Sequence, residues 1–287
     1  MDFLLSYIVL AEIYVLAALS TNLLVGIVGI FSVSQAAVFG VGAYIVAFFL
    51  MHDITGFLPA LAIAALGCIA LNVLLALPSL RVAGDYFVVT SFGIQLLATA
   101  VFTNWTEGTG GANGLPGIPP PDLFGYAIED MRRFLVLATA AAALGGLCFW
   151  LVMRAPVGRR LKAIREDELA VAAAGKPVLS AKVAAAALAG AFAGSAGGIY
   201  ACFLSFIDPS SFDLDASVLM LTMVVVGGAR TLRGSILGPF VLLALPQLLA
   251  LVDIPTTIAA ATRQLMYGLL LIAFMLFRPQ GLAGEKL

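Results

Sequence analysis

Charged residues are scarce in this sequence. Its 287 residues include 15 lysines and arginines and 16 aspartates and glutamates, or 11% of the chain, against about 25% in an ordinary soluble domain. A soluble protein needs polar and charged residues to cover its exterior. The composition therefore excludes a soluble enzyme, and 62% hydrophobic residues also exclude a disordered chain. The formal net charge of −1 gives no general attraction to nucleic acid.

Histidine and cysteine are also rare, which removes the usual ligands of a metal centre. The one histidine, His52, lies in a short polar stretch, where we expect it to be solvated. Cys68, Cys148 and Cys202 each lie inside an apolar run, and their spacing matches neither a disulfide framework nor a zinc site. We therefore predict packed thiols and no metal.

Motifs for catalysis and nucleotide binding are missing as well. The sequence contains no H-E-x-x-H or G-x-S-x-G pattern and no paired carboxylates within an apolar run. Its Gly175-Lys176 pair is followed by Pro177 and lacks the upstream glycine of a phosphate-binding loop. We predict a protein that is not an enzyme and has no cofactor of its own, so that any ATP is bound by partner subunits.

Long apolar runs make up most of the chain. A bilayer core about 30 Å thick is crossed by about 20 apolar residues in a helix. Gly26, Gly29, Ser32 and Ser34 mark a break in the longest run, and residues 3–12 extend its first half. We therefore predict an all-α polytopic membrane protein with about nine transmembrane helices, some of them broken by glycine, in one domain over residues 1–287. The charge-free runs are 13–51, 54–80, 86–106, 134–153, 183–207, 216–229, 234–252 and 264–277.

The distribution of lysine and arginine predicts the orientation. Residues 154–182 contain seven of the 15 basic residues, which places this segment in the cytoplasm. The loops then divide so that 12 basic residues face the cytoplasm and three face outside. The N-terminus is outside, the C-terminus is inside, and residues 105–131 form a periplasmic loop of a multi-pass protein in the bacterial inner membrane. The remaining cytoplasmic residues are Arg81, Arg230, Arg233, Arg278 and Lys286, and the outer ones are Arg132, Arg133 and Arg263.

The outer loop is rich in glycine and proline between residues 107 and 125 and has no apolar period. Gly110, Gly111 and Gly114, together with Asn113, allow backbone amides to turn towards a ligand or a docking protein. An ordinary periplasmic loop is the alternative interpretation.

The inner segment carries charges of alternating sign on a helix-forming background. We predict one short helix from Leu161 to Ala174, ended by Gly175 and Pro177. A charged helix beside the membrane favours contact with another protein, although a solvated linker also fits. The residues expected to contact that partner are Arg159, Arg160, Arg165, Glu168, Ala170, Ala173 and Gly175.

These segments belong to five ordered motifs. The sequence contains NLLVGIVGIFSVSQAAVFGVGAY from Asn22, LPSLRVAGDYFVVTSFG from Leu77, GTGGANGLPGIP from Gly108, GRRLKAIREDELAVAAAG from Gly158, and FIDPSSFD from Phe206 with MLFRPQGL from Met275. With these motifs the chain resembles the M-type permease subunits of ABC importers for branched-chain amino acids and related amides. The resemblance implies that residues 154–182 form the segment that couples to the ATPase. It also implies a second permease subunit in a heterodimer, two cytoplasmic ATPases and a periplasmic substrate-binding protein.

The chain departs from the family pattern at three polar positions near the implied translocation path. Ser34-Gln35 stands where the family often has Gly-His, Gln95 where it often has Glu, and residues 227–231 read GGART where it often has GGxGS. Whether the substrate is a branched-chain amino acid, urea, an amide or an aromatic acid is therefore left open.

Two glycine-rich breaks, residues 26–34 and 227–234, lie between apolar half-spans. Importers often place broken helices at mid-membrane, where freed backbone groups line a cavity. The residues expected along the path are Asn22, Ser32, Ser34, Gln35, Tyr44, Tyr86, Gln95, Gly227 and Gly228.

An ATP-independent secondary transporter or channel is the alternative function. Such a protein usually has ionisable residues deep in its spans, and only Glu12 qualifies here. A membrane scaffold without transport is a third interpretation, but it gives no reason for the charged inner segment or the broken spans. We therefore favour the importer permease.

Overall fold

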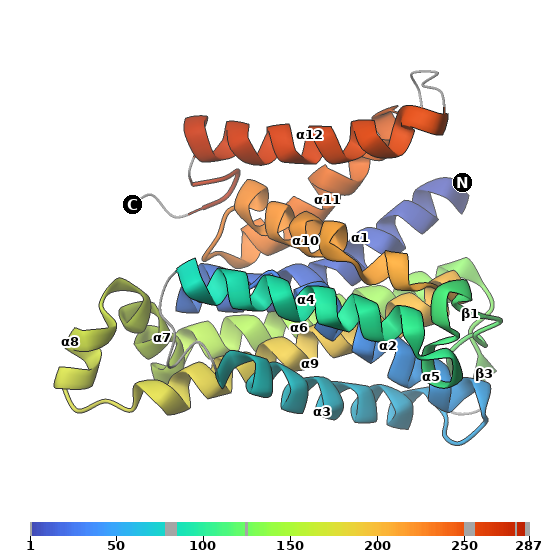
Figure 1. Cartoon of the computed structure of the whole chain (residues 1–287), viewed down its shortest axis with the longest axis horizontal. Coiled ribbons are helices and arrows are strands. Elements are labelled where there is room, and N and C mark those ends of the chain that lie inside the picture. The colour runs from blue at the N-terminus through green and yellow to red at the C-terminus, as the bar shows by residue number, and fades with distance from the viewer. Residues whose placement is uncertain (1, 78–84, 124–125, 250–255, 279, 285–287) are drawn as a thin grey trace.

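The computed structural model describes residues 2–77, 85–123, 126–249, 256–278 and 280–284. In this part of the chain, nine helices of 14 residues or more run mainly along the long axis of the molecule (Figure 1). α1 begins at the end that carries the short strands, and α12 ends at the opposite end (Figure 1). The nine helices are α1 (Asp2–Thr21), α2 (Gln35–Met51), α3 (Phe57–Ala76), α4 (Asp85–Asn104), α6 (Met131–Arg154), α9 (Val178–Leu204), α10 (Leu214–Gly227), α11 (Leu232–Leu249) and α12 (Thr256–Phe277).

Five helical segments among the described residues have the length and composition to cross a membrane. They are Phe3–Val28, Phe57–Ala76, Tyr86–Asn104, Met131–Arg154 and Val178–Leu204. Shorter apolar helices cover Gln35–Met51, Leu214–Gly227, Leu232–Leu245 and Gln264–Phe274. The prediction of an all-α polytopic membrane protein is confirmed. Arg81 and Lys286, both used in predicting the orientation, lie outside the described residues.

The first long apolar run is divided where glycine and serine predicted a break. α1 continues as a π-helix, η1 (Asn22–Val28), which ends at Gly29 in a left-handed conformation with φ +82°. Residues 30–34 are not helical, and α2 begins at Gln35. Because a side chain with a Cβ disfavours this φ, glycine suits the end of the helix.

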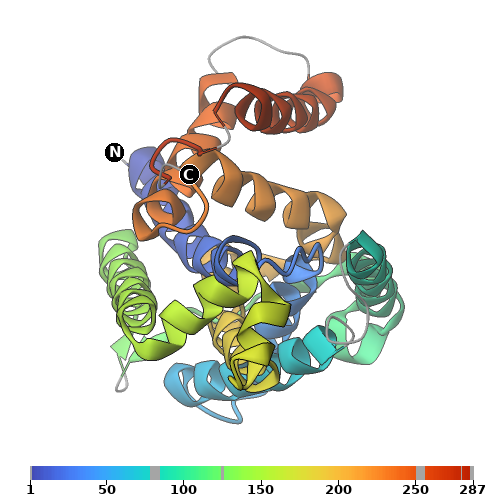
Figure 2. The ribbon, with the colours of Figure 1, turned by 90° about the vertical axis from the view of Figure 1, so that its left-hand side faces the viewer.

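α9 lies at the centre of the bundle and packs against α1, α2 and α3. Glycines bring its backbone close to its neighbours. A Cβ at Gly190 would overlap the carbonyl oxygen of Cys68 on α3, and a Cβ at Gly197 would overlap the carbonyl oxygen of Phe39 on α2. Such close approach maximises packing between helices that share a bilayer. α12 stands at the edge of the molecule and packs against α10 (Figures 1 and 2).

The end of the molecule where α1 begins carries several short elements. Between α4 and α6 lie α5 (Thr106–Thr109), the 3₁₀ turn η3 (Gly111–Asn113) and the strands β1 (Leu115–Pro116), β2 (Asp122–Leu123) and β3 (Tyr126–Ala127). β2 pairs with β3, and β1 pairs antiparallel with β4 (Phe206–Ile207). β4 leads into a second 3₁₀ turn, η4 (Pro209–Phe212), and then into α10. The glycine-rich loop is therefore bonded to the connection between α9 and α10.

Two short helices, α7 (Pro156–Glu166) and α8 (Glu168–Ala173), lie at the opposite end (Figures 1 and 2). The prediction of a single helix from Leu161 to Ala174 is wrong. Asp167 has an extended backbone, with φ −154° and ψ 102°, and its carboxylate accepts a hydrogen bond from the Ala170 amide at 3.0 Å. It therefore ends α7 and caps α8. Gly175 follows α8 with φ +70°, as the sequence predicted.

Candidate translocation path and the charged α7–α8 element

The first turn of α2 lies inside the bundle, level with the middle of α9. The Ser20 hydroxyl donates hydrogen bonds to Gln35 Oε1 at 2.9 Å and to the carbonyl of Ala189 at 2.7 Å. The Gln35 amide nitrogen in turn donates to Asn72 Oδ1 at 3.4 Å, and Asn72 Nδ2 donates to the carbonyl of Ala186 at 2.8 Å. α2 is thus a helix whose N-terminus begins among buried polar side chains.

The Gln95 amide satisfies part of this helix start. The first turn of a helix has backbone N–H groups without partners in the helix. The Ala37 amide donates to Gln95 Oε1 at 3.0 Å, and the Ala36 amide donates to Ser217 Oγ at 3.0 Å. Gln95 Oε1 also accepts from Ser217 Oγ at 3.1 Å, while Gln95 Nε2 donates to the carbonyl of Phe212 at 2.7 Å. One buried amide therefore joins α2, α4, α10 and η4.

Serines complete the polar lining of the break before α2. The Ser32 and Ser34 hydroxyls are 3.0 Å apart and both side chains are buried. The amide of Val33 donates to Ser91 Oγ on α4 at 3.0 Å. The Val33 amide in the non-helical stretch is therefore satisfied by a protein side chain.

An aromatic cluster lies beside this polar region, around Phe212. Its ring centroid is 5.5 Å from that of Tyr44, 5.7 Å from Phe39, 6.1 Å from Tyr200 and 6.2 Å from Phe102. Phe212 is fully buried and Tyr44 is 6% exposed. The Tyr44 hydroxyl has no hydrogen-bond partner among the described residues. Leaving a buried hydroxyl unpaired costs about 1–3 kcal/mol.

The two glycine-rich breaks meet through Asn22. Its Oδ1 accepts a hydrogen bond from the Arg230 amide at 2.8 Å, and its Nδ2 donates to Ser235 Oγ at 2.7 Å and to the carbonyl of Thr231 at 3.1 Å. Asn22 belongs to η1, whereas the other three residues belong to the turn between α10 and α11 and the start of α11. Gly228 allows that turn with φ +117°.

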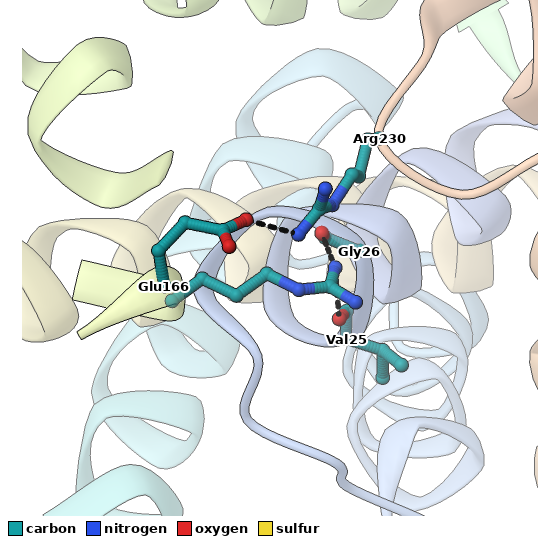
Figure 3. A network of polar contacts seen from close by, with 5 residues as sticks. Val25, Gly26, Glu166 and Arg230 are labelled. Atoms are coloured by element: carbon teal, nitrogen blue, oxygen red, sulfur yellow. Dashed lines mark hydrogen bonds and ion pairs between the residues drawn. The ribbon is translucent and has the colours of Figure 1, made fainter. Parts of the chain in front are cut away.

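α7 is bonded to both breaks (Figure 3). The Arg165 guanidinium donates to the carbonyls of Val25, at 3.2 Å, and of Gly26. The next residue, Glu166, forms an ion pair with Arg230 at 2.6 Å. Burial lowers the pKa of the Arg165 guanidinium below its usual value, and the neighbouring positive charge of Arg230 lowers it further. We call Val25, Gly26, Arg165, Glu166 and Arg230 the α7 clasp.

A groove of about 830 Å³ lies between α7 and α8. No residue of α8 is fully buried, and all of its residues except the half-buried Val171 are exposed. Glu168, however, is engaged within the chain. Its carboxylate pairs with Lys182 Nζ at 2.7 Å, and the Lys182 side chain is only 8% exposed. The groove is lined by Pro156, Arg159, Arg160, Ala163, Glu166, Asp167, Ala170, Val171, Ala174 and Lys176.

The three loop glycines all have positive φ, which the sequence suggested. The values are +74° at Gly110, +61° at Gly111 and +71° at Gly114. A Cβ at Gly114 would overlap the carbonyl oxygen of Ile207, so this glycine allows the loop to lie against β4. Asn113 is exposed at the surface of the loop.

The structure divides the predicted path residues into groups. It brings Ser32, Ser34, Gln35 and Gln95 together at the start of α2 and places Tyr44 in the aromatic cluster. Asn22, Gly227 and Gly228 lie beside the α7 clasp, whereas Tyr86, 77% exposed at the start of α4, lies apart from both groups. Five residues of these groups were not predicted from the sequence. Asn72 and Ser217 could have been predicted, because each is a polar residue within an apolar run. The five are Asn72, Lys182, Phe212, Ser217 and Arg230.

These features define a class of protein. Apolar helices are interrupted inside the bundle, buried polar groups line the interruptions, and a charged helix, α7, is bonded to both breaks. This is the organisation of a polytopic membrane permease.

The chain belongs to the permease family of branched-chain amino-acid transport systems. The family model described as "Branched-chain amino acid transport system / permease component" matches residues 3–275. The sequence motifs had indicated this family, and that prediction is confirmed. The family consists of transport subunits and not of enzymes.

Curated relatives agree. The chain is 31% identical to the high-affinity branched-chain amino acid transport system permease protein LivM of Escherichia coli, over 95% of this chain and 68% of the relative. It is 30% identical to LivM of Salmonella typhimurium, over 94% of this chain and 67% of the relative. PsaBC from Streptococcus pneumoniae in complex with Fab shows a similar fold. The TM-score is 0.50 at 17% identity, over 98% of this chain and 94% of that one.

Proposed function

We propose that this chain is one of two permease subunits in an ABC importer of the bacterial inner membrane. It works with a second, different permease, two cytoplasmic ATPases and a periplasmic binding protein, and it crosses the membrane nine times with the N-terminus outside. Family membership over residues 3–275 supports the importer. The start of α1 and the end of α12 lie at opposite ends of the molecule, which supports an odd number of spans (Figure 1).

The α7 clasp, which we place on the cytoplasmic side, is the observation that carries the coupling part of this proposal. α7 holds the end of η1 through Arg165 and the turn before α11 through Glu166. A displacement of α7 or α8 by an ATPase is therefore transmitted to both helix breaks. The ATPase contacts the exposed surface of α8 and the adjoining groove, with ATP bound by the ATPase alone.

Branched-chain amino acids are the proposed substrates, because both bacterial LivM relatives carry that description. The test is uptake into proteoliposomes that hold the complete importer and a loaded binding protein. The panel is L-leucine, L-isoleucine, L-valine, urea, acetamide and benzoate. ATP-dependent uptake of the three amino acids is expected, and preference for urea or acetamide would refute the assignment. Flux with this chain alone would favour the secondary transporter.

Orientation is tested by labelling single cysteines. Ala112→Cys and Ala172→Cys place thiols at two exposed positions at opposite ends of the molecule. The native Cys68 and Cys202 are buried, and the partly exposed Cys148 is replaced by serine in both variants to remove its background. A membrane-impermeant maleimide added to intact spheroplasts should label position 112 and spare position 172. The reverse pattern would refute the orientation.

A further inference from the structure

Phe212 is carried into the bundle by a segment that is not a spanning helix. η4 connects β4 to α10, and the ring of its last residue is fully buried. The rings of Phe39, Tyr44, Phe102 and Tyr200 surround it, with centroids between 5.5 and 6.2 Å away. These four side chains, from α2, α4 and α9, are called the aromatic cage.

The backbone of Phe212 is also held by a buried group. Its carbonyl oxygen accepts a hydrogen bond from Gln95 Nε2 at 2.7 Å, and Gln95 is itself fully buried. The aromatic cage thus contacts the side chain of Phe212, and the Gln95 amide binds the carbonyl oxygen of the same residue. A free hydrophobic amino acid presents the same pair of groups, an apolar side chain and a carboxylate oxygen.

Tyr44 adds a feature that packing alone does not explain. Its ring contacts Phe102 and Phe212, with centroid distances of 5.0 and 5.5 Å, but its buried hydroxyl has no partner among the described residues. Buried polar groups in native proteins usually have a partner, so an exception calls for an explanation. Phe212 has no charged backbone group to offer, whereas a free amino acid brings both an ammonium and a carboxylate.

Gly40 provides the space in which the Phe212 ring lies. A Cβ on Gly40 would come within 2.8 Å of Phe212 Cγ and within 2.9 Å of Phe102 Cε2. The volume inside the cage therefore depends on a residue without a side chain, and it matches a ring the size of phenylalanine.

We propose that the aromatic cage and the Gln95 amide form the binding site for a hydrophobic α-amino acid within the membrane. In the closed state of the path, the Phe212 side chain occupies this site in place of the substrate side chain. The inference rests on the proposed importer function and adds the place and the chemistry of substrate recognition. The site takes apolar side chains up to the size of a benzyl group and has no place for a small polar solute such as urea.

The outer loop offers a route by which Phe212 is withdrawn. β1 pairs with β4, with Leu115 opposite Ile207, and Gly114 packs on the Ile207 carbonyl. Asp208 then fixes the shape of η4, because its carboxylate accepts hydrogen bonds from the Ser211 amide at 3.2 Å and from the Ser210 hydroxyl at 2.5 Å. A binding protein that moves the loop therefore moves β4 and η4 together and pulls Phe212 from the cage.

Direct binding tests the proposal. The complex of both permeases and the ATPases, without binding protein, is titrated with L-[³H]leucine. Phe212→Ala empties the cage, so its affinity for leucine should exceed that of the unmodified complex by about tenfold or more. L-phenylalanine should compete, and urea and acetamide should not. Phe134→Ala is the matched control, because Phe134 is a buried ring on α6 that packs against Phe203 outside the cage.

Three results would overturn the cage as a binding site. They are absence of leucine binding by a folded Phe212→Ala complex, equal binding by the Phe134→Ala control, and competition by urea. None of them bears on the importer function, which the uptake panel with the unmodified importer tests separately.

Tyr44→Phe provides a second test that does not endanger the fold, since it removes only a hydroxyl without a partner. The melting temperature of the complex should stay level or rise. Maximal leucine uptake with saturating binding protein should fall about tenfold, because the substrate loses one hydrogen bond. Unaltered uptake would show that the hydroxyl does not meet the substrate and would refute the proposal.

Discussion

Loss of the Arg165 side chain should lower the amount of substrate transported per ATP hydrolysed. In Arg165→Ala, the carbonyls of Val25 and Gly26 lose the guanidinium that joins η1 to α7. A hydrogen bond from a charged group contributes about 1.5–3 kcal/mol when buried. Because the guanidinium is partly exposed, we take about 1.4 kcal/mol for both bonds together, which corresponds to about a tenfold change in an equilibrium.

The assay is leucine uptake per ATP hydrolysed in proteoliposomes that hold the complete importer. We expect this ratio to fall about tenfold in Arg165→Ala and less in Arg165→Lys, which keeps the charge but not the planar fork. Arg133→Ala removes an exposed arginine at the opposite end of α6 and serves as the matched control. An Arg165→Ala importer with the normal ratio and a normal melting temperature would refute the clasp as the coupling element.

Four further outcomes are expected. Glu168→Lys should lower the melting temperature, because it leaves the buried Lys182 ammonium facing a like charge, and exchanging the two residues should restore it. Ala170→Trp should lower uptake per ATP without changing the melting temperature, because no residue of α8 is buried. Gly114→Val should lower binding-protein-stimulated uptake, since positive φ in a β-branched residue costs about 1–3 kcal/mol, while basal ATP hydrolysis stays constant. Burial raises the pKa of Asp208, but hydrogen bonds from neighbouring serines outweigh this and hold it below the usual value. The ionised carboxylate therefore stabilises the fold at pH values above the ordinary aspartate pKa of about 3.9. This contribution is lost as the pH falls from about 3.9 through the lower pKa of Asp208 in the folded protein. Asp208→Asn should remove this loss of thermal stability on acidification.

Hydropathy located the long helices well because lipid demands long apolar runs. The break at Gly29 was also predictable, since glycine ends helices in the left-handed conformation. The pairing of the helices was not predictable. In a bilayer all faces of a helix are apolar, so hydropathy did not show that α9 occupies the centre.

The candidate site was predictable only in part. Gln35 and Gln95 were singled out because they stand at polar positions where the family pattern often has another residue. Phe212 was not, because a phenylalanine in such a chain is ordinary and its burial depends on β4 and η4. The split at Asp167 was missed because an acidic residue in a charged segment resembles surface charge, although aspartate is a good helix cap.

The side-chain caps on α2 also constrain how this protein is made. Ala36 depends on a hydroxyl 181 residues further along the chain, and Ala37 depends on an amide 58 residues further along. When α2 leaves the ribosome, neither partner residue has been synthesised. An unpaired backbone amide in the hydrocarbon core costs several kcal/mol of free energy. The first turn of α2 must therefore remain hydrated or non-helical until first α4 and then α10 have entered the membrane. The membrane-insertion machinery therefore receives a helix whose first amides gain all their partners only after most of the polypeptide has been synthesised. In a chain truncated before α10, the Ala36 amide lacks its Ser217 partner.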